Sequence, residues 1–325
     1  MRRLRSIAGR LAMLVTLGIV LSSCGEKEEA PAPAASRAKP SAREKPFTVA
    51  FVGYSSTNVF WITLRQSAEE RAKELGARFE DLTAADPEMS LQKNAIDNAI
   101  LKGVDGLLIG AVDSRGLRDS FDKAQQAGIP IVTVDTEVKH PAVRSHIATN
   151  NIAAATLAGN YIVERLGGKG KVLILGGIPG SQTADDRRKG VADACEAAGM
   201  EVIVRPADWL EAKANEVAQN ELDRDSTIGA IFAACDPMIM AAKQVVKHKG
   251  LRDQIVLVGF DAIPQCLNAI KKGEVDATVR QDPRRMGREG MELLLKHLKG
   301  EQAPRYVPIE AQIIDKNNVD QYITQ

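Results

Sequence analysis

Four aspartates stand where predicted strands end, a position from which a carboxylate can bind a ligand. They are Asp113, Asp135, Asp236 and Asp261, each after a short apolar run. In open parallel sheets, ligands bind beyond the carboxyl ends of the strands. A lone aspartate there more often caps a helix, and this interpretation fits Asp113 and Asp236, which shortly precede predicted helices. Asp135 is followed by a polar loop, so capping explains it less well.

Two tryptophans, Trp61 and Trp209, stand out because aromatic residues make up only 4% of the 325 residues. Each could fill a hydrophobic core or contact a ligand, since flat rings serve both purposes. Their residue type alone leaves both possibilities open.

The motifs predict neither catalysis nor a bound metal or cofactor. The glycine-rich turn Gly176–Ser181 lacks the GxGxxG spacing of dinucleotide sites and the GK[ST] ending of phosphate loops. The four histidines suggest no Ser/His/Asp arrangement and no cluster of metal ligands. Cys195, Cys235 and Cys266 lack metal-site or CxxC spacing, and two of them, Cys195 and Cys266, fall in predicted helices as small buried residues. We therefore expect a protein that is not an enzyme.

Composition and charge set the class of protein. Hydrophobic residues make up 44% of the chain and charged residues 26%, as in a globular protein with an ample core. The 43 basic side chains nearly balance the 42 acidic ones, giving a formal net charge of +1. Nucleic-acid binding is not expected, because it normally requires a strongly basic domain.

The first residues are predicted to be an export signal. A basic start precedes the apolar run Leu11–Leu21, which has the length of a secretory h-region. The run ends at Cys24 in the sequence LSSC, which resembles the bacterial lipobox; an ordinary signal peptide with a chance cysteine is the alternative. We expect residues 1–23 to be removed and Cys24 to carry a lipid. Residues 24–46, rich in Ala and Pro, would form a tether on the periplasmic side of the cell envelope.

From Thr48 onward, short apolar runs alternate with longer amphipathic stretches. Strands are predicted at residues 48–53, 78–83, 106–110, 130–135, 171–175, 201–205, 230–233, 255–259 and 277–280. Predicted helices separate them, which is the pattern of βαβ units with parallel strands. Roughly ten strands in about 280 residues exceed one doubly wound sheet, so we expect an α/β fold of two Rossmann-like lobes.

An ordered set of segments resembles the ribose-type periplasmic sugar-binding proteins. The segments are Tyr54–Trp61 (YSSTNVFW), Gly128–Asp135 (GIPIVTVD), Ser145–Asn150 (SHIATN), Gly180–Gly190 (GSQTADDRRKG), Pro206–Trp209 (PADW), Val258–Asp261 (VGFD) and Ala277–Pro283 (ATVRQDP). The resemblance covers about residues 48–299 with almost no change in length. It implies two α/β lobes, joined by three hinge crossings, that close over a sugar.

The resemblance also implies where the lobes divide. Residues 47–149 with 282–310 would form the N-terminal lobe, and residues 150–281 with 311–325 the C-terminal lobe. The crossings would fall near Thr149–Asn150, Gln281–Asp282 and Ile309–Glu310. Ligand contacts from both lobes would stabilise the closed state and shift an existing open–closed equilibrium.

Carried over residue by residue, the resemblance implies a sugar site. It assigns stacking on the sugar ring to Phe60, Trp61 and Trp209. It assigns hydrogen bonds with the hydroxyls to Asn58, Asp135, Arg187, Asp261 and Gln281. A sugar offers apolar C–H faces to flat rings and a rim of hydroxyls to charged and amide groups. Alternatively, Phe60 and Trp61 pack at a helix start, and Arg187 pairs with Asp185 or Asp186.

Three positions depart from the ribose-binding pattern. Thr136 replaces a sugar-contacting arginine, Cys235 replaces an asparagine at a ligand-binding position, and Tyr54 replaces a small polar residue. Two strong hydrogen-bonding groups are thus lost, and a larger ring narrows the pocket. We therefore expect a pentose or hexose other than ribose, or a ligand with fewer hydroxyls.

The sequence thus predicts an exported lipoprotein that captures a monosaccharide. Its expected partners are the permease and ATPase of an ABC importer, with a chemoreceptor as a second candidate. We expect a monomer that contacts the membrane through its lipid anchor. The alternative is a non-sugar ligand such as a nucleoside or a quorum signal, bound for sensing rather than uptake.

Overall fold

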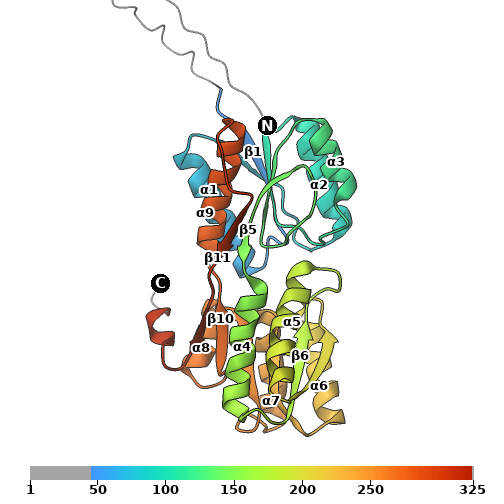
Figure 1. Cartoon of the computed structure of the whole chain (residues 1–325), viewed down its shortest axis with the longest axis vertical. Coiled ribbons are helices and arrows are strands. Elements are labelled where there is room, and N and C mark those ends of the chain that lie inside the picture. The colour runs from blue at the N-terminus through green and yellow to red at the C-terminus, as the bar shows by residue number, and fades with distance from the viewer. Residues whose placement is uncertain (1–44, 324–325) are drawn as a thin grey trace, which may run out of the picture. The chain divides into compact units, whose positions relative to one another are not determined.

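The computed structural model describes residues 45–323, which belong to one compact unit. The predicted signal peptide, Cys24 and the tether up to residue 44 lie outside the described residues. Two α/β lobes each hold a six-stranded sheet flanked by helices (Figure 1). The predicted fold class is confirmed. Among residues 45–323, no helix is both long and apolar enough to cross a membrane.

The N-terminal lobe is built on a wholly parallel sheet. Its strands are β1 (Thr48–Val52), β2 (Arg78–Asp81), β3 (Gly106–Ile109), β4 (Ile131–Val134), β5 (Val143–Thr149) and β11 (Tyr306–Ile309). Their order is β11-β5-β4-β3-β1-β2, and every neighbouring pair is parallel. The chain leaves β1 for β2 on one side and then returns to β3 on the other. The carboxyl end of β1 is therefore a topological switch point.

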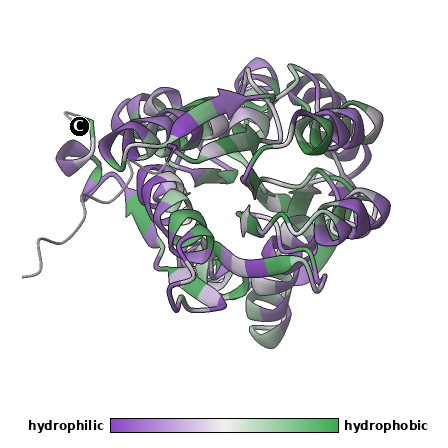
Figure 2. Cartoon of the chain, turned by 90° about the horizontal axis from the view of Figure 1, so that it is seen from above, coloured by the Kyte–Doolittle hydropathy of each residue, from purple (hydrophilic) through white to green (hydrophobic). Residues whose placement is uncertain are grey.

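Helices cover both faces of this sheet (Figure 1). One face carries α1 (Val59–Glu74) and α9 (Pro283–Leu298), and the other carries α2 (Met89–Lys102) and α3 (Arg118–Gln126). The sheet thus has a hydrophobic core on each side. In Figure 2, hydrophobic residues gather on the strands and hydrophilic residues on the outer helices, as burial of both sheet faces requires.

The C-terminal lobe repeats this plan. Its strands are β6 (Lys171–Gly176), β7 (Glu201–Pro206), β8 (Ile228–Ala233), β9 (Val256–Asp261), β10 (Ala277–Arg280) and β12 (Gln312–Asp315). Its helices are α4 (Asn151–Leu166), α5 (Gln182–Ala197), α6 (Glu211–Arg224), α7 (Asp236–His248), α8 (Pro264–Lys271) and the 3-10 helix η1 (Val319–Gln321). The strand order is β12-β10-β9-β8-β6-β7, parallel except for the antiparallel edge strand β12. The carboxyl end of β6 is the switch point of this sheet.

The chain passes between the two sheets three times. It does so from β5 to α4, from β10 to α9, and from β11 to β12. The Thr149 hydroxyl, at the end of β5, donates a 2.6 Å hydrogen bond to Oε1 of Gln281, just after β10. Two of the three crossings are therefore linked directly.

Three strands, β5, β11 and β12, were not among the predicted ones. The β5 sequence VRSHIAT carries an arginine and a histidine, so it shows no apolar run. The β11 sequence contains Pro308, which the sheet accommodates because β11 is an edge strand. The four-residue strand β12 also lies at an edge. These strands are defined by their pairing partners rather than by their own composition.

Candidate functional site

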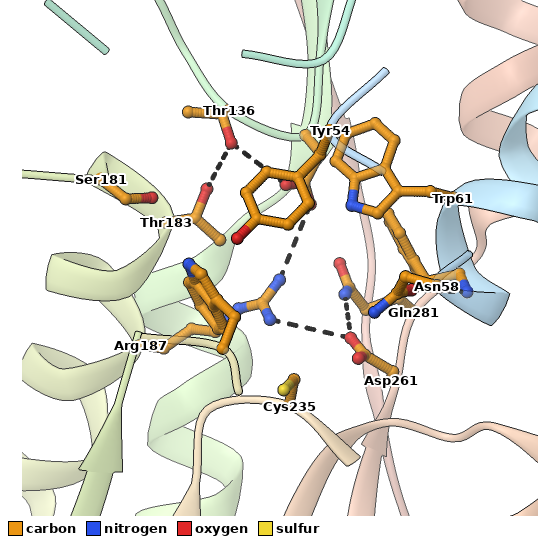
Figure 3. A pocket seen from close by; sticks show the side chains of 13 residues that line it. Tyr54, Asn58, Trp61, Thr136, Ser181, Thr183, Arg187, Cys235, Asp261 and Gln281 are labelled. Carbon is orange, nitrogen blue, oxygen red and sulfur yellow. Dashed lines mark hydrogen bonds and ion pairs between the residues drawn. The ribbon is translucent and has the colours of Figure 1, made fainter. Parts of the chain in front are cut away.

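The carboxyl ends of the strands of both sheets surround one cavity, with an accessible volume of about 50 Å³ (Figure 3). Its lining residues are Tyr54, Asn58, Phe60, Trp61, Asp135, Thr136, Ser181, Thr183, Arg187, Trp209, Cys235, Asp261 and Gln281. Those before residue 150 come from the N-terminal lobe, and the others from the C-terminal lobe or the crossing after β10. The cavity is therefore closed by both lobes.

The two switch points supply much of the lining. The loop after β1 carries Tyr54 and Asn58 and leads into α1. The Asn58 side chain caps this helix, because its Oδ1 accepts a 2.9 Å hydrogen bond from the Phe60 backbone N–H. The cap fixes the first turn, which holds Phe60 and Trp61. The loop after β6 leads into α5, whose inner face carries Arg187.

Aromatic side chains form the wall from the N-terminal lobe. Trp61 packs against Gly110, where a Cβ would overlap the indole ring. Tyr54 stacks on Trp61 with ring centroids 6.0 Å apart, and Phe60 meets the indole edge to face at 5.4 Å. Phe60 and Trp61 also belong to the core beneath α1. Phe60 and Trp61 therefore pack at the start of the helix and also line the cavity.

Trp209 is the corresponding aromatic of the C-terminal lobe. It packs against Gly177, directly after β6, and a Cβ there would overlap its ring as well. The backbone is left-handed at Asp208 and Trp209, with φ values of 54° and 63°. Lys213 forms an ion pair with the Asp208 carboxylate in this turn. Each tryptophan thus occupies space that a glycine near a strand end leaves open.

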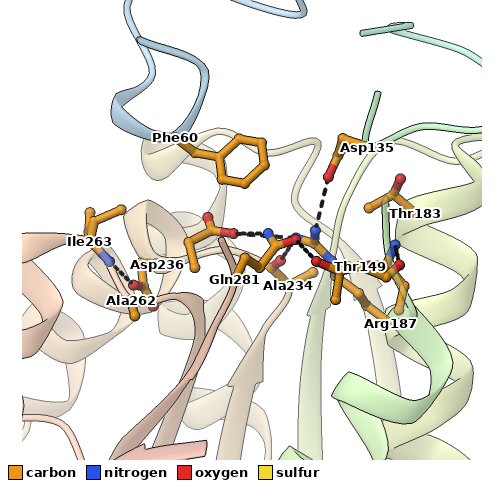
Figure 4. A network of polar contacts seen from close by, with 12 residues as sticks. Phe60, Asp135, Thr149, Thr183, Arg187, Ala234, Asp236, Ala262, Ile263 and Gln281 are labelled. Carbon is orange, nitrogen blue, oxygen red and sulfur yellow. Dashed lines mark hydrogen bonds and ion pairs between the residues drawn. The ribbon is translucent and has the colours of Figure 1, made fainter. Parts of the chain in front are cut away.

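The Arg187 guanidinium lies buried at the base of the cavity. Its plane packs over the Phe260 ring at 3.9 Å from the centroid. Its Nε donates a 2.9 Å hydrogen bond to Oδ1 of Asn151, and its Nη1 donates a 2.8 Å hydrogen bond to the Ala234 carbonyl. Helix, sheet and ring therefore hold the guanidinium in one orientation. Figure 4 shows Arg187 with Ala234 and Asp135.

Arg187 lies between two carboxylates. Its Nη2 is 3.6 Å from Oδ1 of Asp135, and its Nη1 is 3.7 Å from Oδ1 of Asp261. Because Asp135 follows β4 of the N-terminal lobe, whereas Arg187 and Asp261 belong to the C-terminal lobe, the ion pair with Asp135 joins the two lobes. The alternative partners Asp185 and Asp186 are not its ion-pair partners in the structure.

Asp135 leaves one oxygen without a hydrogen bond. Its Oδ2 accepts a 3.2 Å hydrogen bond from Thr136, whose hydroxyl also lies 3.2 Å from that of Thr183 in the other lobe. Its Oδ1 and the Tyr54 hydroxyl are buried with no hydrogen-bond partner among the described residues. Burial raises the pKa of Asp135, and burial chiefly raises that of Tyr54, so the phenol stays protonated. Both unpaired atoms belong to side chains that line the cavity.

Asp261 connects the cavity to the crossing between the lobes. Its Oδ1 accepts a 2.7 Å hydrogen bond from Nε2 of Gln281, the residue whose Oε1 accepts from Thr149. Burial raises the pKa of Asp261 to about 8, although Arg187 opposes the shift. The Gln281 side chain therefore links the Asp261 carboxylate to two of the three crossings.

Asp236 and Asp113 were predicted to cap helices, but neither side chain does so in the structure. Asp236 is the first residue of α7, but its carboxylate accepts hydrogen bonds from the Ile263 backbone N–H (2.8 Å) and the Thr278 hydroxyl (2.7 Å). It therefore links the start of α7 to β10 and to the N-cap of α8. Asp113 accepts from the backbone N–H groups of Arg115 and Gly116, which stabilises the loop before α3 rather than the helix itself.

Backbone strain concentrates at the cavity. Among residues 45–323, the non-glycine residues with positive φ are Asp135, Asp208, Trp209, Asp261 and Ala262. Asp135, Trp209 and Asp261 line the cavity, and the other two are their chain neighbours. Left-handed backbone costs energy outside glycine and persists where the surroundings enforce it, commonly at functional sites.

All nine residues predicted to bind ligand line this cavity, although their contacts with a ligand stay a prediction. Four further lining residues were not in that set: Tyr54, Thr136, Ser181 and Thr183. Tyr54 and Thr136 were noted only as departures from the ribose pattern. Ser181 and Thr183 lie in a segment that carried the resemblance, but small hydroxyl residues give no signal of their own.

The cysteines are buried free thiols in the described chain. Cys195, Cys235 and Cys266 form no disulfide there, and burial raises the pKa of each thiol. The burial of Cys195 in α5 and Cys266 in α8 matches the predicted small apolar role. Among residues 45–323, no group of three or more His, Cys, Asp or Glu side chains could hold a metal ion.

Comparison with known proteins gives a consistent result. Residues 49–302 match the family model described as periplasmic binding protein domain. The ribose import binding protein RbsB of Salmonella typhimurium is 32% identical over 272 residues, which cover 83% of this chain and 90% of that protein. The D-allose-binding periplasmic protein of Escherichia coli is 29% identical over 266 residues, covering 78% and 84%. A periplasmic solute binding protein of an ABC transporter from Actinobacillus succinogenes, solved with bound D-allose, has a TM-score of 0.80 and 28% identity, covering 86% of this chain and 100% of that one.

Proposed function

This chain belongs to the periplasmic binding protein family, and we propose that it captures a monosaccharide between its two lobes for an ABC importer. The observation that carries the proposal is the cavity closed by both lobes, with a tryptophan from each and unpaired polar atoms on its wall. Rings suit the C–H faces of a sugar, and the polar groups suit its hydroxyls. Two relatives, named for ribose import and for D-allose binding, support a small sugar.

We propose that the bound sugar is not ribose. Thr136 offers a short hydroxyl, and Cys235 offers a thiol that burial keeps protonated. Neither can replace the two or three directed hydrogen bonds of an arginine or an amide. The Tyr54 ring, stacked on Trp61, narrows the same space. A ribose affinity above that of every other sugar in a broad panel would contradict this part of the proposal.

The direct test is a thermal-shift screen of the chain from Lys45 onward, the compact unit of the structure. The panel would hold pentoses, hexoses, sugar alcohols and nucleosides. A ligand that binds only the native state raises the unfolding midpoint by mass action. We expect one or a few monosaccharides to do so. A shift with nucleosides alone would favour the non-sugar alternative, and no shift with any compound would contradict the proposal.

We also propose that the protein is exported and held by lipid on Cys24. The LSSC sequence supports this, as does membership of a family of periplasmic proteins. A palmitate analogue should label the full-length chain in cells, and Cys24→Ala should abolish the label. Equal labelling of both chains would contradict the anchor.

The proposed partners are the permease and ATPase of an importer, with a chemoreceptor as the second candidate. We propose that the protein meets them as a monomer. Light scattering of the chain from Lys45 onward should give the mass of one copy with and without sugar. A stable dimer would contradict this.

A further inference from the structure

Buried acidic groups outnumber buried basic groups around the cavity. The charged residues that line it are Asp135, Asp261 and Arg187. Asp236, completely buried behind Asp261, adds a third carboxylate. Removing charges from water is costly unless opposite charges compensate them. One guanidinium therefore cannot compensate three carboxylates, and burial raises the pKa of each of these carboxyl groups.

Arg187 is also committed to other acceptors. Its short hydrogen bonds go to Asn151 and to the Ala234 carbonyl, whereas both carboxylates lie beyond hydrogen-bond distance, at 3.6 and 3.7 Å. Arg187 cannot satisfy the carboxylates by a small rotation without breaking these bonds.

Two acceptor atoms on the opposite wall have no donor among the described residues. They are Oδ1 of Asp135 and the hydroxyl oxygen of Tyr54. Asp135 is more than nine-tenths buried, and it lines the same cavity as Tyr54, whose pKa its charge helps to raise. The stacked rings of Tyr54 and Trp61 line the same cavity, and aromatic rings attract cations.

We propose that the ligand carries a positively charged amine, as an amino sugar or amino cyclitol does, with its ammonium group against Oδ1 of Asp135. The inference rests on the proposed capture of a sugar-like ligand and narrows its class. A neutral hydroxyl would satisfy the unpaired oxygen but would supply no positive charge to the buried carboxyl groups. An ammonium group supplies both the hydrogen-bond donors and the missing positive charge.

The test compares amines with their hydroxyl counterparts by calorimetry. The probes are D-glucosamine with D-glucose, D-galactosamine with D-galactose, D-mannosamine with D-mannose, and scyllo-inosamine with scyllo-inositol. Each pair differs at one substituent and in charge. In at least one pair we expect the amine to bind at least tenfold more tightly. If the hydroxyl member binds as tightly or more tightly in every pair, this inference is wrong, while sugar capture stands. If no compound in the set or in the wider sugar panel binds, both are wrong.

An Asp135→Asn variant locates the effect. Asparagine tolerates the left-handed backbone at this position and keeps the size of the side chain. The variant should lose most of the preference for the amine. The control is Asp193→Asn, the same change on the exposed side of α5, which should keep it. An unchanged preference in Asp135→Asn would overturn the assignment to Asp135.

Proton exchange gives a second readout. Burial raises the pKa of Asp261 to about 8. The titratable groups that influence it are Arg187 on α5, Asp236 and Cys235 at the start of α7, Asp135 after β4, and Cys266 on α8. A bound cation lowers such a pKa and expels a proton, whereas a neutral sugar does not. At pH 7, binding heats in buffers of different ionisation enthalpy should reveal proton release with the amine only. Equal proton exchange for both members of a pair would contradict the inference.

Discussion

At the residue scale, the two tryptophans should matter for different reasons. Trp209 contributes mainly to the cavity, whereas Trp61 is also part of the core beneath α1. Trp209→Ala should weaken binding of the best sugar by about 2 kcal/mol, or roughly 30-fold, with a small loss of stability. Trp61→Ala should weaken binding similarly and also lower the free energy of unfolding by about 3–5 kcal/mol. Titration calorimetry and urea unfolding measure the two effects.

A buried aromatic away from the cavity provides the control. Phe121→Leu, in the core beneath α3, should reduce stability without changing the dissociation constant. If Trp209→Ala behaves like Phe121→Leu, its role is packing alone.

The Asp261 carboxyl group predicts a pH dependence of stability. Its folded-state pKa of about 8 lies above the unfolded value of about 4, so its contribution is fully present below pH 4 and is lost as pH rises toward 8. Relative to Asp261→Asn, the wild-type protein should therefore lose stability between pH 5 and 8, by at most about 1.4 kcal/mol per pH unit. Urea unfolding at several pH values measures this difference. If the free energies of unfolding of the two proteins change with pH in the same way, the raised pKa of Asp261 is contradicted.

Only some of the residues that line the cavity could be predicted from residue types and their order along the chain. Asp135 and Asp261 stood out at strand ends, and Trp61 and Trp209 as possible ligand contacts in a chain with few aromatics. The remaining ligand-binding positions came from the family resemblance. The role of Asp236 was missed because its partners, Ile263 at the start of α8 and Thr278 in β10, are distant in sequence and no local pattern connects them to it. The unpaired hydroxyl of Tyr54 likewise depends on everything that surrounds it in three dimensions.

At the element scale, two loops after strands set the positions of the tryptophans through glycines. Gly177→Ala would push the Trp209 ring out of place, because the added methyl overlaps the indole. We expect at least a tenfold loss of sugar affinity and a lower unfolding temperature. The adjacent Gly176→Ala is a matched control, since its methyl would meet only a carbonyl oxygen at 3.6 Å. Equal affinities for the two variants would contradict the cradle role of Gly177.

The elements themselves were predictable where their own sequence determines them. Buried central strands such as β3 and β9 are continuous apolar runs, so their position follows from composition. The strand β5 carries several polar residues, and β11 and β12 are short edge strands. Their structure comes from pairing with distant segments, which local periodicity does not report.

At the scale of the whole molecule, the lobes are expected to move about the three crossings. We propose that residues 47–149 with 282–310 move against residues 150–281 with 311–325. The Arg187–Asp135 ion pair and the Thr136–Thr183 contact join the lobes across the cavity, so a ligand between them should favour closure. Small-angle scattering should show a smaller radius of gyration at saturating sugar. An unchanged radius would contradict ligand-driven closure.

The central claim is that a small sugar-like ligand binds in the cavity between the lobes. The most direct measurement is a crystal structure with the tightest compound from the screen. We predict the ligand ring between Trp61 and Trp209, with a polar group of the ligand hydrogen-bonded to Oδ1 of Asp135. Ligand density outside this cavity, or a ligand that leaves Asp135 unpaired, would contradict the account.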